Sequence, residues 1–161
     1  VPAALGALTA LKVFDLSGNQ LSTVPAELEG LAALTELDLR ENELTSVPAA
    51  LGNLSAALQV LVLGSNRLTS VPAELGGLAA LTAFDLHNNQ LTTVPAEFGR
   101  LTSLTVLSLR QNQLTSVPAE LGQGLRKLMR LYLEENQQLT SLPAEWEEGG
   151  WLERCGCGIS R

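Results

Sequence analysis

The sequence is poor in aromatic residues and in cysteine. Three Phe, two Trp and one Tyr account for 4% of the 161 residues, whereas 45% of the residues are hydrophobic. Leucine, valine and alanine must therefore build the core, and the length is sufficient for one domain with a continuous core. The two cysteines are too few for the disulfide framework of a small secreted domain. This scarcity favours a reducing, cytoplasmic location, with a removed secretory leader as the alternative.

Positive charge is scarce as well. Ten Lys and Arg residues stand against 17 Asp and Glu residues, so the formal net charge is −7 at pH 7. Because no basic stripe is available to neutralise phosphates, we expect no nucleic-acid binding. The sequence also lacks an apolar run of about 18 residues, so we expect no membrane insertion. Neither a phosphate-binding glycine loop nor zinc-ligand spacing occurs, and we therefore expect no cofactor and no metal.

What the sequence has instead is an internal repeat. Two markers recur every 23 to 25 residues: the prolines Pro2, Pro25, Pro48, Pro72, Pro95, Pro118 and Pro143, and the asparagines Asn19, Asn42, Asn66, Asn89, Asn112 and Asn136. Two independent markers with one period establish a repeat. We expect one domain over 1–161, built from repeats 1–23, 24–46, 47–70, 71–93, 94–116 and 117–141, and a degenerate or truncated repeat 142–161.

The second repeat shows the pattern of the unit. It reads Leu31-x-x-Leu34-x-x-Leu37-x-Leu39-x-x-Asn42-x-Leu44-x-x-Val47-Pro48-x-x-Leu51. This resembles the leucine-rich repeat signature L-x-x-L-x-L-x-x-N-x-L, and six copies extend the resemblance over essentially the whole chain. The repeat length is most similar to the intracellular Ras-associated scaffold class. The resemblance implies an α/β solenoid: a curved right-handed superhelix with a concave parallel sheet of about seven short strands and short α or 3-10 turns on the convex side.

Each part of the repeat predicts an element. Leu37-x-Leu39 alternates as a short strand with one buried face, and such strands should stack in parallel about 4.8 Å apart. The asparagine amide can donate to and accept from backbone groups where the chain turns out of the strand. Proline suits the first position of a helix. Four residues later come glycines that we expect to be left-handed at the helix end, namely Gly6, Gly52, Gly76, Gly99 and Gly122.

Several segments depart from the repeat. Extra residues around Ala56-Ala57, Gln123-Gly124 and Gln137-Gln138 predict local bulges. Near the C-terminus, Leu152, Cys155 and Cys157 fall on the slots of a seventh strand, where both thiols would point inward. Pairing of these cysteines with another chain, or metal binding, is the alternative.

Neither end of the chain carries a dedicated polar cap. Core slots such as Leu5, Leu8 and Leu11 would be exposed at the end of a solenoid. The first residue, Val1, already lies inside the repeat pattern. We therefore expect either a longer parent protein or end-to-end association through the uncapped termini.

The residues that alternate with the strand leucines should face the concave side, where the family usually binds partners. Their first third is acidic, their middle is apolar and their last third carries Arg and Tyr, as expected for a protein-binding surface. We predict an interaction module, a scaffold or signalling component, that binds a protein or peptide. Its contact residues would be Glu36, Asp38, Arg40, Val60, Val62, Asp85, His87, Val106, Arg110, Arg130 and Tyr132.

Other functions have weaker support. A glycan or small-ligand site would need more exposed aromatics than Tyr132. The hydroxyl pairs of the motif "LTSVP" could form a row that binds ice, but we expect them to bond the local backbone. An engineered consensus repeat without a natural partner is a further alternative. Asp85, His87 and Ser108 have the residue types of a catalytic triad, but Asp85 should lie between the other two, so no enzyme activity is predicted.

The same strands bring two carboxylates together. Asp15 and Asp38 should be lateral neighbours about 4.8 Å apart on the concave face. We interpret them as a solvated pair rather than as a cation site.

Overall fold

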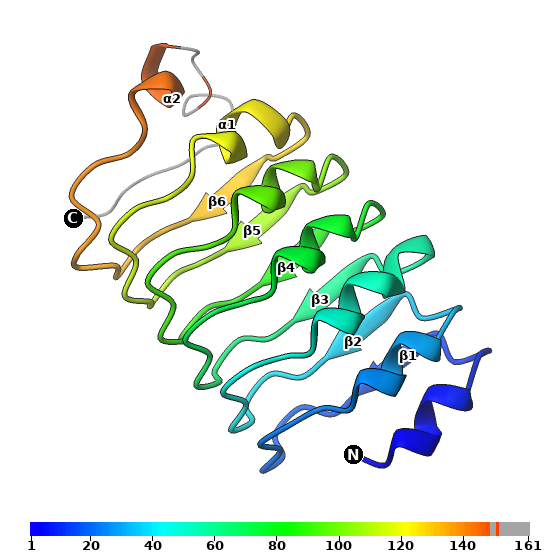
Figure 1. Cartoon of the computed structure of the whole chain (residues 1–161). Coiled ribbons are helices and arrows are strands. Elements are labelled where there is room, and N and C mark those ends of the chain that lie inside the picture. Colours follow the sequence, from blue (N-terminus) through cyan, green and yellow to red (C-terminus); the bar gives the residue numbers. More distant parts are fainter. Residues whose placement is uncertain (149–150, 152–161) are drawn as a thin grey trace.

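The computed structural model describes residues 1–148 and Trp151, arranged as a stack of similar coils (Figure 1). The strands are β1 (Val13–Asp15), β2 (Glu36–Asp38), β3 (Val60–Val62), β4 (Ala83–Asp85), β5 (Val106–Ser108) and β6 (Arg130–Tyr132). All pair in parallel, in sequence order, in one sheet. The predicted solenoid is confirmed. Six of about seven expected strands are described, and the proposed seventh, at Leu152, Cys155 and Cys157, lies outside the described residues.

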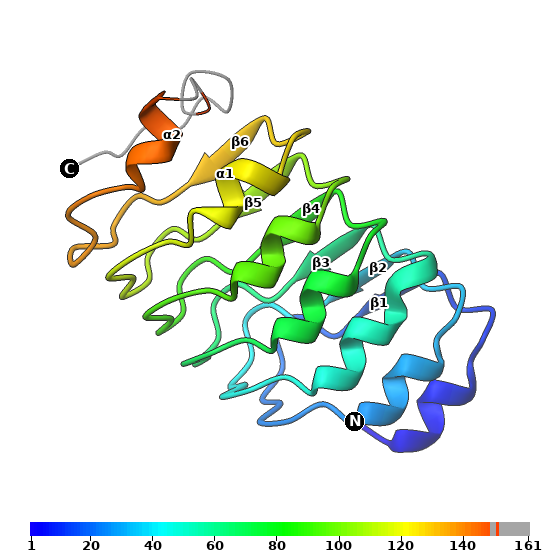
Figure 2. The ribbon, with the colours of Figure 1, turned by 45° about the horizontal axis from the view of Figure 1, so that its top comes forward.

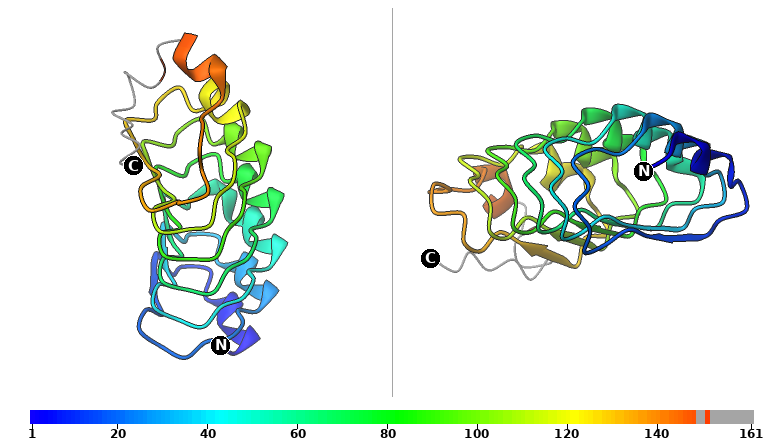
Figure 3. Two further views of the ribbon diagram at one scale, coloured as in Figure 1. Left: turned by 90° about the vertical axis from the view of Figure 1, so that its left-hand side faces the viewer. Right: turned by 90° about the horizontal axis from the view of Figure 1, so that it is seen from below.

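Short helices cover the opposite side of the stack from the sheet (Figures 2 and 3). They are η1 (Ala3–Ala7), η2 (Ala26–Gly30), η3 (Ala49–Ala56), η4 (Ala73–Gly77), η5 (Ala96–Arg100), α1 (Glu120–Gly124) and α2 (Ala144–Glu148). The η helices are 3-10 helices. Within the described part of the chain, no helix has the length and apolar character required to cross a membrane.

The prolines lie one position earlier than predicted. Pro25 has φ −73° and ψ 147° and precedes the first helical residue as the N-cap. Its ψ is extended, which turns the chain from the preceding loop into the helix. The same holds for Pro2, Pro48, Pro72 and Pro95.

The extra residues are absorbed where the sequence predicted irregularity. The one near Ala56 lies in η3, which is eight residues long where η2 has five. The one at Gln123-Gly124 lies in α1, an α-helix in a position where the preceding repeats have 3-10 helices. Gln137 and Gln138 form a turn closed by the Leu139 N–H, which donates to the Asn136 carbonyl at 3.0 Å.

One continuous apolar core runs between the sheet and the helices. Leu34, Leu37, Leu39 and Leu44 are fully buried, and their counterparts in the next repeats are at most 8% exposed. In the fourth and fifth repeats Phe84 and Phe98 occupy leucine positions, with ring centroids 5.3 Å apart. The leucine pattern of the sequence therefore predicted the core correctly.

Buried asparagines join consecutive repeats. The Asn66 side-chain amide donates to the carbonyls of Leu63 at 3.0 Å and of Leu39, one repeat back, at 2.9 Å. Its carbonyl oxygen accepts from the Leu44 N–H at 3.0 Å. The same pattern recurs at Asn42, Asn89, Asn112 and Asn136. The predicted role of these asparagines is confirmed, and each one satisfies backbone groups that would otherwise be buried unpaired.

The residue before each asparagine has a left-handed backbone, which the sequence analysis did not predict. These residues are Gly18 (φ 63°), Glu41 (53°), Ser65 (54°), Asn88 (50°), Gln111 (55°) and Glu135 (59°). Five of the six are not glycine, although this conformation costs a side-chain-bearing residue about 1 kcal/mol. The turn directs the N–H of the residue to the next repeat, as in the 2.8 Å bond from the Ser65 N–H to the His87 carbonyl.

The glycines on the helix side are not left-handed, so this prediction was wrong. Among the described glycines, Gly18 alone has a positive φ. Gly99 is required for another reason, because a Cβ there would lie 2.6 Å from the Glu120 carbonyl oxygen. At Gly122 a Cβ would overlap the Trp146 ring. These glycines let neighbouring helices approach each other closely.

The two ends of the described stack differ. Trp146 in α2 is 1% exposed, its Nε1–H donates to the Ala119 carbonyl at 3.2 Å, and its ring centroid lies 4.5 Å from that of Trp151. At the other end Leu8 is 48% and Val13 is 54% exposed. Of the core slots predicted to be exposed at the N-terminal end, Leu8 is exposed, whereas Leu5 and Leu11 are partly buried against the core. At the other end, two indoles cover the last described repeat.

Candidate binding surface

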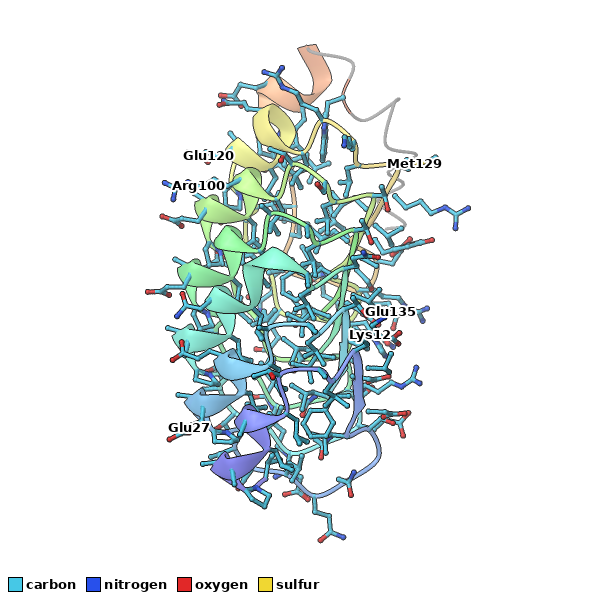
Figure 4. All side chains as sticks on the ribbon, turned by 90° about the vertical axis from the view of Figure 1, so that its right-hand side faces the viewer. Lys12, Glu27, Arg100, Glu120, Met129 and Glu135 are labelled. Atoms are coloured by element: carbon cyan, nitrogen blue, oxygen red, sulfur yellow. The ribbon has the colours of Figure 1, made fainter. Side chains whose placement is uncertain are left out.

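The sheet and the helices present different sets of side chains to solvent. In Figure 4, Lys12, Met129 and Glu135 lie on the sheet side, and Glu27, Arg100 and Glu120 lie on the helix side. Register aligns the outward-facing strand residues in columns. One column is Val13, Glu36, Val60, Ala83, Val106 and Arg130, and the next is Asp15, Asp38, Val62, Asp85, Ser108 and Tyr132. Eight of the eleven predicted contact residues are in these columns, and the other three, Arg40, His87 and Arg110, lie two residues after the second column.

The first third of this surface is acidic, and one of its carboxylates, Asp38, pairs with the neighbouring Arg40. Asp15 and Asp38 are lateral neighbours, as predicted. Asp38 is only 6% exposed, and it accepts from the Arg40 N–H at 3.0 Å and pairs with Arg40 Nε at 3.2 Å. The expectation of a solvated pair is therefore wrong for Asp38. Asp15 is exposed, and hydrogen bonds from the side chain and then the backbone of Ser17 lower the pKa of its carboxyl.

The centre of the surface is apolar. Val60 lies beside Ala83, and Ala83 lies beside Val106, in three adjacent strands. Val62 lies beside Asp85 at the next position. All four apolar side chains are half-buried. This strip, which we call the valine strip (Val60, Val62, Ala83 and Val106), is contiguous and offers apolar area that a partner could cover.

The last third carries an ion-pair network. The Arg110 Nε and Nη2 groups donate to Glu135 Oε1 at 3.0 and 2.7 Å, and Gln111 Nε2 donates to Glu135 Oε2 at 2.9 Å. The bonds from Gln111 and then Arg110 lower the pKa of Glu135. Arg110 is therefore held in place by a neighbouring repeat, whereas Arg130 in β6 is exposed.

Between the valine strip and the turns lies a polar chain centred on His87. Its Nδ1 lies 2.9 Å from Asp85 Oδ1, and its Nε2 lies 3.3 Å from Ser65 Oγ. The ring packs over Gly64, where any Cβ would overlap it. As the sequence predicted, Asp85 lies between His87 and Ser108, because Ser108 is its neighbour in the register. The sequence analysis missed Ser65 because this serine lies in the turn before Asn66, outside the strand pattern.

The hydroxyl pairs of the repeat form an exposed row. It comprises Ser22, Thr23, Thr45, Ser46, Thr69, Ser70, Thr92, Thr93, Thr115, Ser116, Thr140 and Ser141. Within this described row, only Thr93 and Thr115 donate from a side chain to a backbone carbonyl, each at 3.4 Å. The prediction that these hydroxyls bond the local backbone is therefore wrong for most of them, and they face solvent instead.

No metal site is found in the part of the chain that the structure describes. There, no three or more His, Cys, Asp or Glu side chains are grouped so that they could hold an ion.

Comparison with known proteins identifies the class. The family profile described as "Leucine rich repeat" matches residues 2–44, 33–91, 56–114 and 102–149. This chain belongs to the leucine-rich repeat family. Proteins of this family and fold are typically binding modules without enzymatic activity. The narrower assignment to the Ras-associated scaffold class stays a prediction.

Solved structures agree with the family. A leucine-rich repeat protein of Leptospira interrogans is similar over 82% of this chain, with 38% identity and a TM-score of 0.77. The ectodomain of the Arabidopsis thaliana receptor kinase GASSHO1/SCHENGEN3, in complex with CASPARIAN STRIP INTEGRITY FACTOR 2, matches 83% of the chain at 35% identity and a TM-score of 0.73. The complex PEPR1-AtPEP1 matches 81% at 37% identity and a TM-score of 0.70.

The chain is much shorter than these structures. It spans 33% of the Leptospira protein, 17% of the GASSHO1/SCHENGEN3 chain and 19% of the PEPR1 complex chain. A search of curated protein sequences found no match.

Proposed function

We propose that this chain is a protein-interaction module that binds a partner protein or peptide on its concave face. The observation that carries this proposal is the valine strip, a contiguous apolar centre between an acidic end and an Arg/Tyr end. Interfaces combine such an apolar centre with polar flanks, and Arg and Tyr are enriched among their main contacts. Two similar structures, GASSHO1/SCHENGEN3 and PEPR1, are complexes, which supports a binding role.

The proposed contacts are divided by chemistry. The acidic end would meet a basic side chain, the valine strip an apolar one and the Arg/Tyr end an acidic one. We propose the contact set Glu36, Asp38, Arg40, Val60, Val62, Asp85, His87, Val106, Arg110, Arg130 and Tyr132. Binding rather than catalytic turnover is its main role.

A peptide-display selection against the immobilised chain tests this function. We expect enriched peptides to combine a basic, an apolar and an acidic residue, and to bind the double variant V62E/Y132A at least about tenfold more weakly, which corresponds to about 1.4 kcal/mol. The matched control is Arg100→Glu, on the helix side (Figure 4), which should leave binding unchanged. Peptides that retain full affinity for V62E/Y132A would contradict the placement on the concave face.

We also propose self-association at the N-terminal end of a single domain over 1–161. Strand β1 is an edge strand, and Val13 on it is 54% exposed. An exposed strand edge readily pairs with another chain, and a Lys side chain opposes such pairing. Sedimentation should reveal dimers whose population falls in Val13→Lys. A strict monomer over a wide concentration range would refute this association without affecting the concave site.

A further inference from the structure

We propose that Ser65 is an activated nucleophile, and that it accepts the acyl group of an activated ester such as an aryl ester. The proposal rests on the polar chain Asp85, His87, Ser65 and Asn88 and does not require partner binding, although Asp85 and His87 also belong to the proposed contact set. These four residues come from two consecutive repeats, and the ends of β3 and β4 bring them together.

His87 is held as the base. Its Nδ1 lies 2.9 and 3.0 Å from the two oxygens of Asp85, and the same carboxylate accepts from the His87 backbone N–H at 2.9 Å. A carboxylate can only accept, so this contact assigns the ring proton to Nδ1. Nε2 then presents its lone pair to Ser65 Oγ, 3.3 Å away. This is the order of roles in which a carboxylate orients a histidine and the histidine takes the proton of a serine.

The position of Ser65 is fixed from both sides. Its backbone N–H donates to the His87 carbonyl at 2.8 Å, and its φ of 54° keeps it in the turn. Gly64 supplies the space that the His87 ring occupies. The side-chain amide of Asn88 donates to Ser65 Oγ at 3.3 Å, so a neutral donor lies next to the reacting atom. The same bond helps to orient the Ser65 hydroxyl.

The chemistry is a single acyl transfer. Ser65 Oγ attacks the ester carbonyl carbon while its proton passes to His87 Nε2, and a tetrahedral intermediate forms. The intermediate collapses as the bond to the leaving oxygen breaks, and the proton held on His87 passes to that oxygen. The products are an acyl-serine at Ser65 and the free phenol or alcohol.

Acetylation by p-nitrophenyl acetate tests the proposal, with the modified residue located by peptide mass spectrometry. Ser65 should be acetylated about a hundredfold faster than Ser108, the range in which a positioned general base acts. Ser108 is the matched comparison because it is also half-buried on the concave face and also neighbours Asp85. The variants His87→Gln and Asp85→Asn should slow acetylation of Ser65, and Ser108→Ala should not.

Further variants test separately whether Ser65 is the nucleophile and whether His87 is the base. Rescue by imidazole also shows that the variant used is folded. His87→Gly leaves space over Gly64, and added imidazole should restore acetylation of Ser65 in that variant. The proposal is overturned if Ser65 reacts no faster than Ser108, or if imidazole fails to rescue folded His87→Gly. It is also overturned if p-nitrophenol release is unchanged in Ser65→Ala, because the imidazole itself would then be the nucleophile.

Discussion

Arg110 binds Glu135 across two consecutive repeats, with 2.7 Å between Nη2 and Oε1. Both side chains are about half exposed, at 51% and 53%. Exposed ion pairs contribute little to stability, so the main consequence of this pair is positional. It holds the guanidinium of Arg110 over the end of β5, where a partner with an acidic group would meet it already oriented.

The first prediction concerns the pKa of Glu135. The hydrogen bond from Gln111 is the larger cause of its lowering, followed by that from Arg110, so Gln111→Ala should raise the pKa toward the ordinary value of 4.5. An NMR titration of the Glu135 carboxyl measures this pKa. Gln113→Ala, two residues further along the chain than Gln111, serves as the control and should leave the pKa unchanged.

The sign of the pH dependence follows from the same shift. Because folding lowers the pKa of Glu135, its contribution to stability is fully present above pH 4.5 and is lost as the pH falls through the folded-state value. Acid unfolding of Gln111→Ala should therefore depend less steeply on pH in this window than unfolding of the unmodified chain. An unchanged carboxyl titration in Gln111→Ala would show that the bond does not form in solution.

The second prediction concerns the asparagine row. Asn89→Ala removes the amide that donates to the carbonyls of Leu63 and Leu86 and the oxygen that accepts from the Leu68 N–H. The carbonyls of Leu63 and Leu86 still accept from the amides of Asn66 and Asn112, so the Leu68 N–H is the group left without a partner. Such a buried group costs about 1–3 kcal/mol, and the free energy of unfolding should fall by about 2 kcal/mol. Urea denaturation measures the loss. The exposed Asn53, which bonds only the Glu29 side chain, is the control, and Asn53→Ala should cost less than about 0.5 kcal/mol.

The third prediction separates two glycines on the helix side. In Gly99→Ala the new methyl group would lie 2.6 Å from the Glu120 carbonyl oxygen, and η5 would have to move away from α1. We expect a loss of about 2 kcal/mol, as for overpacking elsewhere. In Gly77→Ala the nearest atom, the Gly52 carbonyl oxygen, is 3.6 Å away, so this variant should be unchanged or more stable by up to about 1 kcal/mol. Equal effects in thermal unfolding would rule out close helix approach as the cause.

The fourth prediction concerns the left-handed turn at Glu41, where φ is 53°. Glycine adopts this conformation without strain, so Glu41→Gly should be more stable than Glu41→Ala by about 1 kcal/mol. At an ordinary exposed position the order would be reversed. Chemical denaturation of the two variants measures the difference, and a less stable glycine variant would refute the strain.

Most of the fold could be predicted from the sequence because the same few leucine and asparagine positions recur in six repeats. Leu37, Leu39 and Asn42 have one role each, and that role can be recognised from period and polarity alone. The conformation of Gly18 and its counterparts could not be recognised in this way. Only one of the six residues is glycine, and the left-handed turn is imposed by hydrogen bonds between repeats rather than by the local residue.

The candidate surface was predicted less completely. Alternation placed Val60, Val62 and Tyr132 on one face correctly, although their binding role stays a prediction. Pairings between turns were missed, since no period relates Arg110 to Glu135 or Ser65 to His87. Such contacts depend on where a particular side chain points once the repeats are stacked.

Trp146 and Trp151 make the two ends of the stack unequal in how well they are covered. In a solenoid each repeat is stabilised by its neighbours, so unfolding begins wherever a terminal repeat is least covered. The first repeat, with Leu8 open to water, is less covered than the last described one, which lies beneath two indoles. The chain should therefore fray from η1 toward α2, and amide hydrogen exchange would then slow progressively from the early repeats to the later ones.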